Sequence, residues 1–315
     1  MDVTVIICTH NHDKSLRQTL ESLVRLRVPE GMSCELIVVD NASEDCTAEV
    51  VRSCEMTNMA VCYIYEPRRG QCYARNAALA AARGEVILFT DDDVRLPHNW
   101  IEGMCAPILQ GEADAIVGGV KIAPHLERSW MEKGHRWWMG SSEYINVDAP
   151  EGMIGANMAF SKKVLEKVPG FDTELGPGAL GFEDDTLFTR QIVAAGYRLG
   201  CALDVCVEHH FDESRLSRDG FFERSRRAAM SWAYVAYHWE HQLIRFPRLR
   251  LAKAMLRLMY KRLRNRRDMR RDEGVPSWEI DVVCGVYFYK QHLAERGRKF
   301  NYEKHGLVKV RNGDC

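Results

Sequence analysis

The chain has 315 residues, of which 46% are hydrophobic, so it is long enough to bury a full α/β domain together with a smaller appendage. Its 43 Lys and Arg residues against 44 Asp and Glu give a net charge of −1, which excludes the global basic field of a nucleic-acid-binding protein. Any electrostatic partner must therefore be recognised by a local cluster of charge.

The sequence predicts neither export nor insertion into a membrane. The eleven cysteines lie in apolar segments without the CxxC spacing of zinc or redox motifs, which predicts the buried free thiols of a cytosolic protein. An acidic residue, Asp2, stands where a signal peptide would carry positive charge. No apolar run approaches the roughly 20 residues that a membrane-spanning helix needs. We expect a cytoplasmic protein, either free or peripheral on the cytoplasmic face of the membrane.

Apolar strands and amphipathic helices alternate along the first 90 residues. The expected strands cover residues 3–8, 36–39, 61–65 and 86–89. The expected helices, where leucine or alanine recurs at helical spacing, cover residues 16–26, 47–52 and 73–82. Strands separated by helices predict an α/β fold with a mostly parallel sheet, in which ligands bind outside the carboxyl ends of the strands.

The chain changes character after about residue 215. We expect an α/β catalytic domain over residues 1–215 and a helical, basic and aromatic region over residues 216–315. Within this region the run 245–271 alternates Arg and Lys with apolar residues. Such a helix could lie on an anionic membrane surface, or it could be an ordinary solvated helix face.

Three consecutive carboxylates follow the strand expected at 86–89. Alternation along the extended chain places Asp91 and Asp93 on one side and Asp92 on the other. Carboxylates paired at a strand end repel each other unless a cation or a shared proton intervenes, and their hard oxygen atoms suit Mg²⁺ or Mn²⁺. We expect a divalent-metal site that also binds substrate phosphates, with a solvated acidic turn as the alternative.

A second acidic pair, Glu183 and Asp184, precedes an amphipathic run over residues 187–196. Negative charge at a helix N-terminus can serve as a cap alone. It can also act as a general base, if a carboxylate faces the crevice and accepts a proton from a substrate hydroxyl. Both interpretations stay open on sequence grounds.

Two histidines, His209 and His210, follow an apolar strand expected over residues 201–207. An imidazole at a strand end can complete a metal shell, so His209 is a candidate ligand. A histidine satisfied within the core or at the surface is the alternative interpretation.

Aromatic residues and a cation gather between two glycines, Gly134 and Gly140. The faces of Trp137 and Trp138, with Arg136 beside them, could grip a sugar or a phosphate-bearing substrate. The alternative is that these tryptophans pack the domain, since tryptophan is mostly buried in proteins.

Taken in order, these stretches resemble the motifs of the family 2 glycosyltransferases, which are inverting enzymes with the GT-A fold. The resemblance covers roughly the first two-thirds of the chain and rests on the order and spacing of several short motifs. The matching stretches are VTVIICTHN (3–11), LIVVDNAS (36–43), RRGQCYARN (68–76), LFTDDDV (88–94), IGANMAF (154–160), PGFD (169–172), ED (183–184) and VEHHF (207–211).

The resemblance implies a role for each motif. Asp40 would hold the nucleobase or ribose, Asp92 would contact the ribose, and Asp184 would be the general base, with Glu183 as second candidate. The implied donor-binding residues are Thr9, His10, Asn11, Asp40, Arg75, Asp91 and Asp92. The implied metal ligands are Asp91, Asp93 and His209, and the acceptor-side candidates are Asn157, Trp137 and Trp138.

We therefore expect a metal-dependent, hexosyltransferase-type enzyme of polysaccharide biosynthesis with Mn²⁺ or Mg²⁺ as cofactor. It would move a sugar from a nucleoside-diphosphate donor, most commonly a UDP-sugar in this family, to a hydroxyl of a glycan or lipid-linked acceptor, without a covalent intermediate. A sugar nucleotidyltransferase is disfavoured because the loop at residues 9–13 lacks the Gly, Lys and Arg of a phosphate cradle. A non-catalytic carbohydrate- or membrane-binding protein is disfavoured because every acidic motif residue is retained.

Overall fold

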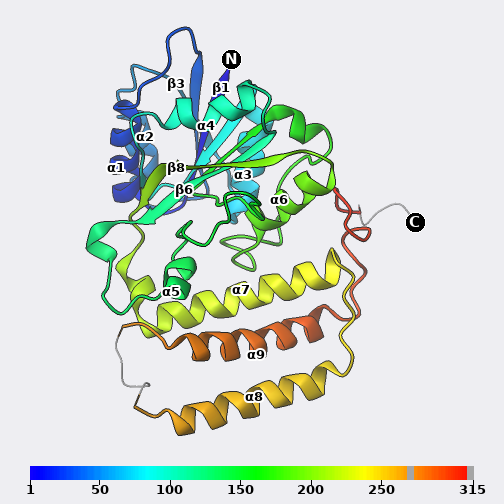
Figure 1. The fold of residues 1–315 in the computed structure, drawn as a ribbon. Coiled ribbons are helices and arrows are strands. Elements are labelled where there is room, and N and C mark those ends of the chain that lie inside the picture. The colour runs from blue at the N-terminus through cyan, green and yellow to red at the C-terminus, as the bar shows by residue number, and fades with distance from the viewer. Residues whose placement is uncertain (268–272, 311–315) are drawn as a thin grey trace.

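The computed structural model describes residues 1–267 and 273–310 as one sheet covered by helices, with three long helices stacked beneath it (Figure 1). Within these ranges the eight strands have the order β3-β2-β1-β4-β7-β6-β8-β5. Residues 268–271 of the basic run 245–271 and residues 311–315 lie outside the described residues.

The half of the sheet built from the first 90 residues is parallel, as the sequence predicted. Its strands are β1 (Val3–Thr9), β2 (Cys34–Asp40), β3 (Ala60–Tyr65) and β4 (Val86–Thr90). The helices between them are α1 (Asp13–Val24), α2 (Thr47–Arg52) and α3 (Gln71–Ala81). Alternate side chains of β1 enter opposite layers, so Val5 and Ile7 share a core with α1 while Ile6 shares one with α3.

The other half of the sheet is mixed. Its strands are β5 (Val94–Arg95), β6 (Ala115–Ile122), β7 (Asn157–Ser161) and β8 (Leu199–His209). β7 runs antiparallel to both β4 and β6, β8 runs parallel to β6, and β5 runs antiparallel to β8. The expected mostly parallel sheet therefore describes β1–β4, whereas no periodicity in the sequence predicted β5, β6 or β7.

Shorter helices connect the strands of this mixed half. The α-helices are α4 (Trp100–Leu109), α5 (Lys133–Trp138) and α6 (Asp184–Ala194). The 3-10 turns are η1 (Pro124–Leu126), η2 (Lys162–Glu166) and η3 (Glu213–Leu216). Of these elements α6 was predicted, because its apolar residues recur at helical spacing.

Three long helices follow β8 and pack in layers. They are α7 (Arg218–His238), α8 (Pro247–Arg264) and α9 (Ser277–Glu295). α7 contacts α9 and α9 contacts α8, so α8 forms the layer farthest from the sheet (Figure 1). Phe221 and Ala228 of α7 share a core with Ile280 and Cys284 of α9. Within the part of the chain that the structure describes, no helix is long and apolar enough to cross a lipid bilayer.

Candidate functional site

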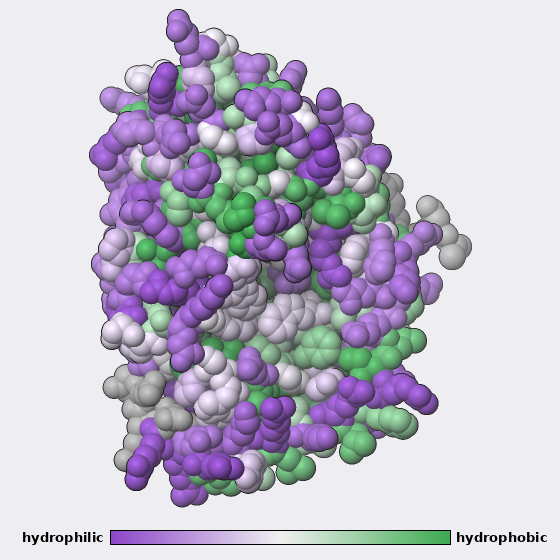
Figure 2. Space-filling view, viewed as in Figure 1, coloured by the Kyte–Doolittle hydropathy of each residue, from purple (hydrophilic) through white to green (hydrophobic). Residues whose placement is uncertain are grey.

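A cavity of about 700 Å³ opens between the carboxyl ends of β1 and β4 and the helix α7, where the surface is recessed in Figure 2. The loop after β1, the acidic turn after β4 and the N-terminus of α6 line one side. Residues of α5, η3 and α7 line the other. The two regions that the sequence divided near residue 215 thus contribute to a single site.

Asp91, Asp93 and His209 come together in the lining of this cavity. One ligand atom from each lies within 4.8 Å of the other two. The carboxylates belong to the turn that follows β4, and His209 ends β8. The pairing of Val94 with His209 in the β5–β8 ladder brings these residues together, although 93 and 209 are far apart in the chain. Asp91 and Asp93 face together because of this turn rather than through the strand alternation that we expected.

The ring of His209 is oriented toward the two carboxylates. Its Nδ1 lies 3.0 Å from the carbonyl oxygen of Met139, which can only accept, so Nδ1 carries a proton. Its Nε2 then faces Asp93 Oδ1 at 3.4 Å. His210 points elsewhere, with Nε2 at 3.5 Å from Glu208 and its ring against His125. Of the two adjacent histidines, His209 is therefore the one that the fold directs at the acidic cluster.

The cluster has the chemistry of a divalent-metal site. Burial and the charge of Asp93 raise the pKa of Asp91 to about 6. Asp93 Oδ1 is buried and accepts no hydrogen bond from any described residue. A divalent cation would relieve both the repulsion between the carboxylates and the unsatisfied oxygen. Two carboxylates with one imidazole suit Mn²⁺ or Mg²⁺, so the residues present fit a metal.

Three positively charged groups that the sequence analysis did not select surround the acidic cluster. His12 Nδ1 lies 3.2 Å from Asp92 Oδ1, and this hydrogen bond raises the pKa of His12 to about 9. Arg215 of η3 approaches Asp93 at 3.8 Å. Arg224 of α7 forms no ion pair with any described residue, and burial lowers its pKa to about 9. Because Arg224 also lines the cavity, it can accept an anionic group there.

The residues predicted for the nucleotide side divide into two groups. Thr9 and His10 line the cavity, and His10 Nδ1 donates to the carbonyl of Asn41 at 2.7 Å. Asp40 does not line it, because its carboxylate accepts hydrogen bonds from Ser43 N at 2.9 Å and Tyr63 Oη at 2.7 Å.

Asn11 also lies outside the cavity lining, and its Oδ1 accepts from Glu44 N at 2.7 Å. The side chains of Asp40 and Asn11 therefore stabilise the loops in this structure, and their roles in donor binding stay predictions. Asn41, which was not among the implied donor-binding residues, lines the cavity.

Arg75 forms a buried ion pair with Asp184 at 2.5 Å. Its guanidinium lies over the rings of Phe89 and Phe171, at 5.6 and 5.0 Å from their centres. Arg75 is 3% exposed and Asp184 6% exposed, so both charged side chains are buried. Removing one partner of such a pair generally costs about 3–5 kcal/mol of stability. The pair holds Asp184 at the start of α6, where its side chain lines the cavity.

The neighbours of Asp184 are also acidic and line the cavity. Glu183 has a left-handed backbone (φ 69°) and accepts a hydrogen bond from Trp232 Nε1 at 3.0 Å. Burial and the charge of Asp185 raise the pKa of Glu183 to about 7. Asp185 accepts from Gly155 N at 2.9 Å, and burial together with Asp184 raises its pKa. Burial therefore favours the protonated form of both Glu183 and Asp185 in this cavity.

An aromatic wall faces these carboxyl groups. The ring centres of Trp137 and Trp138 are 4.8 Å apart, and Trp232 of α7 packs on Trp138 at 6.0 Å. Trp137 is 37% exposed, whereas Trp138 is 8% exposed. Trp138 mainly packs the wall, whereas Trp137 is the more exposed of the two, and both line the cavity. A role of Trp137 in binding a sugar stays a prediction.

Asn157, selected as an acceptor-side residue, lies inside the protein. It is fully buried, accepts from Trp100 Nε1 at 2.8 Å and donates to the carbonyls of Gly119 and Val205 at 2.8 Å. These hydrogen bonds tie β7 to β6 and β8. In this structure Asn157 therefore stabilises the sheet and does not line the cavity, so direct contact with an acceptor is not supported by its position.

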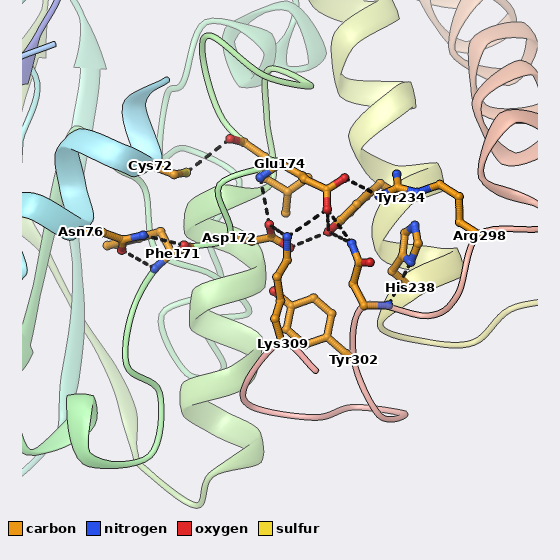
Figure 3. Close-up of polar contacts among 12 residues, drawn as sticks. Cys72, Asn76, Phe171, Asp172, Glu174, Tyr234, His238, Arg298, Tyr302 and Lys309 are labelled. Carbon is orange, nitrogen blue, oxygen red and sulfur yellow. Dashed lines mark hydrogen bonds and ion pairs between the residues drawn. The ribbon is translucent and has the colours of Figure 1, made fainter. Parts of the chain in front are cut away.

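The last two residues of the PGFD motif, Phe171 and Asp172, make structural hydrogen bonds, as Figure 3 shows. Asp172 Oδ2 accepts hydrogen bonds from Tyr234 of α7 at 2.8 Å and from Tyr302 at 2.7 Å, and Lys309 forms an ion pair with the same carboxylate. This network joins the last described residues and α7 to the loop before α6. Because that loop forms part of the cavity wall, the network fixes the wall from behind.

Comparisons with known proteins agree with this architecture. The family model described as "Glycosyl transferase family 2" matches residues 4–168. The glycosyltransferase AglE of Haloferax volcanii is 26% identical over 215 residues, which cover 66% of each chain. The succinoglycan biosynthesis protein ExoM of Rhizobium meliloti is 28% identical over 263 residues, which cover 81% of each chain. The chain spans between 48% and 66% of the length of AglE and two further curated relatives.

A solved structure has a similar fold. The mannosyltransferase PcManGT from Pyrobaculum calidifontis, in complex with GDP-Man and Mn²⁺, has a TM-score of 0.56 and 21% sequence identity. The match covers 91% of this chain and 69% of that one. This likeness concerns the fold.

Proposed function

Because the chain belongs to glycosyl transferase family 2, we propose that it moves a hexose from a nucleoside-diphosphate donor to a hydroxyl of a glycan or lipid-linked acceptor, with inversion at the anomeric carbon. The observation that carries the proposal is the cluster of Asp91, Asp93 and His209 within a large cavity that Arg215 and Arg224 also line. The name of ExoM favours a role in polysaccharide biosynthesis. The reaction is glycosyl transfer rather than nucleotidyl transfer, in keeping with the family.

On the donor side, Asp91, Asp93 and His209 would hold a divalent cation, Mn²⁺ or Mg²⁺. Bound there, it would stabilise the negative charge that develops on the leaving nucleoside diphosphate. Arg224, which forms no ion pair with any described residue, and Arg215, whose ion pair with Asp93 is long at 3.8 Å, would supply further positive charge for the phosphates. Thr9, His10 and Asn41 would contact the nucleoside from the loops after β1 and β2.

On the acceptor side, Asp184 is the proposed general base. The ion pair with Arg75 fixes its position at the cavity wall, and it would accept the proton of the acceptor hydroxyl as that oxygen attacks the anomeric carbon. Trp137 offers an aromatic face on which a sugar ring can stack. A single displacement needs no enzyme nucleophile, and the ten free cysteines among the described residues need no catalytic role.

Donor binding tests the proposal directly. We expect one nucleoside diphosphate from a panel of UDP, GDP, ADP and dTDP to raise the melting temperature of the protein with Mn²⁺ or Mg²⁺ present and to lose this effect with EDTA. The matching nucleotide sugar should then be turned over slowly to free nucleoside diphosphate even without acceptor. If no nucleotide shifts the melting temperature with or without metal, the proposed function is wrong.

The adjacent histidines offer a matched test of the metal ligand. His209→Gln is expected to weaken Mn²⁺ binding at least about tenfold, because the ring directed at Asp93 is lost. His210→Gln should bind Mn²⁺ like the wild type, because that ring lies against Glu208 and His125 instead. Isothermal titration with Mn²⁺ measures both variants. Equal losses in the two variants, or a larger loss in His210→Gln, would contradict the assignment.

A further inference from the structure

Helix α8 carries two apolar stripes on opposite sides. The half-buried stripe consists of Leu251, Ala254 and Leu258, as expected for the side that packs on α9. The second, which we call the outer stripe, is exposed to solvent. It consists of Leu249, Leu256, Met259, Tyr260 and Leu263, which are between 52% and 69% exposed. At 3.6 residues per turn these five side chains fall within an arc of about 100°, so they form one continuous face.

Positive charge borders the outer stripe. Residues 243–267 contain ten Lys and Arg and no Asp or Glu, although the whole chain has a net charge of −1. Lys253, Arg257 and Arg264 project from the helix along one edge of the outer stripe, as their spacing in the sequence requires. Among the described residues only Arg262 of this segment forms an ion pair, with Glu279 of α9 at 2.7 Å. Lys253, Arg257 and Arg264 are exposed and form no ion pair with any described residue, so they are available to an external anionic surface.

The positive charge beside the outer stripe indicates whether this face binds a second copy of the chain or a lipid bilayer. An exposed apolar face of this kind marks a contact surface, since isolated soluble domains rarely keep one. A second copy of the chain would have to bring the same cations against each other in a symmetric contact, without a carboxylate between them. An anionic bilayer offers acyl chains for the leucines and phosphate groups for the cations bordering them.

We propose that α8 is an in-plane anchor that docks the protein on an anionic lipid surface, with the outer stripe inserted at the boundary between headgroups and acyl chains. Leu243 and Phe246, which are 66% and 71% exposed, extend the apolar face beyond the start of the helix. This inference goes beyond the proposed function, and it does not depend on the catalytic chemistry. α9 and α7 separate α8 from the cavity (Figure 1), so the anchor can be altered without touching the site.

Vesicle co-sedimentation of the full chain tests the anchor without donor or acceptor. We expect the protein to bind phosphatidylcholine vesicles that contain about one third phosphatidylglycerol and to bind pure phosphatidylcholine far more weakly, with the difference shrinking at high salt. The combined variant Leu256→Ser, Met259→Ser and Leu263→Ser should bind the anionic vesicles at least about tenfold more weakly. The matched control, Leu109→Ser, Val147→Ser and Val193→Ser, replaces equally exposed apolar residues elsewhere and should bind like the wild type.

A second variant, in which cations and not apolar residues are replaced, tests the membrane anchor independently. Lys253→Gln, Arg257→Gln and Arg264→Gln together should lower the affinity for anionic vesicles roughly 10²-fold, about fivefold for each cation. Thermal melting and Mn²⁺-dependent nucleotide binding should be unchanged in all of these variants. The proposal is overturned if the folded wild type does not bind anionic vesicles at low salt, or if the outer-stripe variant binds them as tightly. It is also overturned if the wild type is a dimer in solution and the outer-stripe variant is a monomer, because the outer stripe would then be a contact between two copies of the chain.

Discussion

Asp93→Asn is expected to lower metal-dependent turnover of the nucleotide-sugar donor by about 10²–10³-fold, the loss typical of removing one electrostatic stabiliser of a transition state. The buried Oδ1 of Asp93 has no hydrogen-bond partner among the described residues, and its carboxylate lies with Asp91 and His209 in one cluster. The amide of asparagine keeps the size of the side chain and removes its negative charge. Release of nucleoside diphosphate measures the rate, and Mn²⁺ titration measures whether the metal still binds.

A control separates this effect from a general loss of charge. Asp148 is an exposed aspartate far from the acidic cluster in the sequence, and it does not line the cavity. Asp148→Asn should turn over donor and bind Mn²⁺ like the wild type. If Asp93→Asn keeps wild-type affinity for Mn²⁺, the cluster is not the metal site, whatever happens to the rate.

Asp184→Asn is expected to lower the transfer rate by about 10²–10⁴-fold while donor binding is retained, because the amide cannot accept the proton of the acceptor hydroxyl. Asp184 sits at the cavity wall in its ion pair with Arg75, so the substitution also leaves Arg75 buried without a charged partner. We therefore expect a loss of stability of about 3–5 kcal/mol, which urea unfolding would measure. Rates should be compared well below the melting temperature of the variant.

Glu183→Gln is the matched comparison, because Glu183 is the second candidate base. The pKa of Glu183 is raised to about 7, so in the wild type its carboxylate form dominates above pH 7 and is lost as the pH falls below 7. If Asp184 is the base, Glu183→Gln should keep most of the rate and change the pH profile only near pH 7. If instead Glu183→Gln loses more activity than Asp184→Asn at pH 8, Glu183 is the base and the assignment to Asp184 is wrong.

Local patterns in the sequence predicted the elements whose neighbours are close in the chain. The strands β1 to β4 and the helices between them were placed within three residues, because side-chain periodicity is a property of the segment itself. The family was also recognisable from short motifs in order, and the family match confirms it. The acidic run after β4 was predicted for the same reason, since its three carboxylates are consecutive.

The mixed half of the sheet depended on contacts that no local pattern reveals. β7 pairs with β4 through residues such as Asn157 and Thr90, which are far apart in the sequence, and its direction follows from the path of the connecting chain. Because of the same long-range packing, the side chain of Asn157 points into the protein interior, although its motif suggested a ligand-binding residue. Asp40 likewise became a loop-stabilising acceptor because Tyr63 of β3 lies beside it.

The sequence by itself determined the α/β class, the family and the acidic, tryptophan and histidine residues from which a site could be built. Only the tertiary structure decided which of them meet: the β5–β8 ladder brings His209 rather than His210 to Asp93, and Arg75 is paired with Asp184. It also added three cavity residues that lie in no motif: His12 from the loop between β1 and α1, Arg215 from η3, and Arg224 from α7, which packs beneath the sheet. The physical reason is that periodicity and motif spacing report on neighbouring residues, whereas a binding site is made by side chains that meet in space from distant segments.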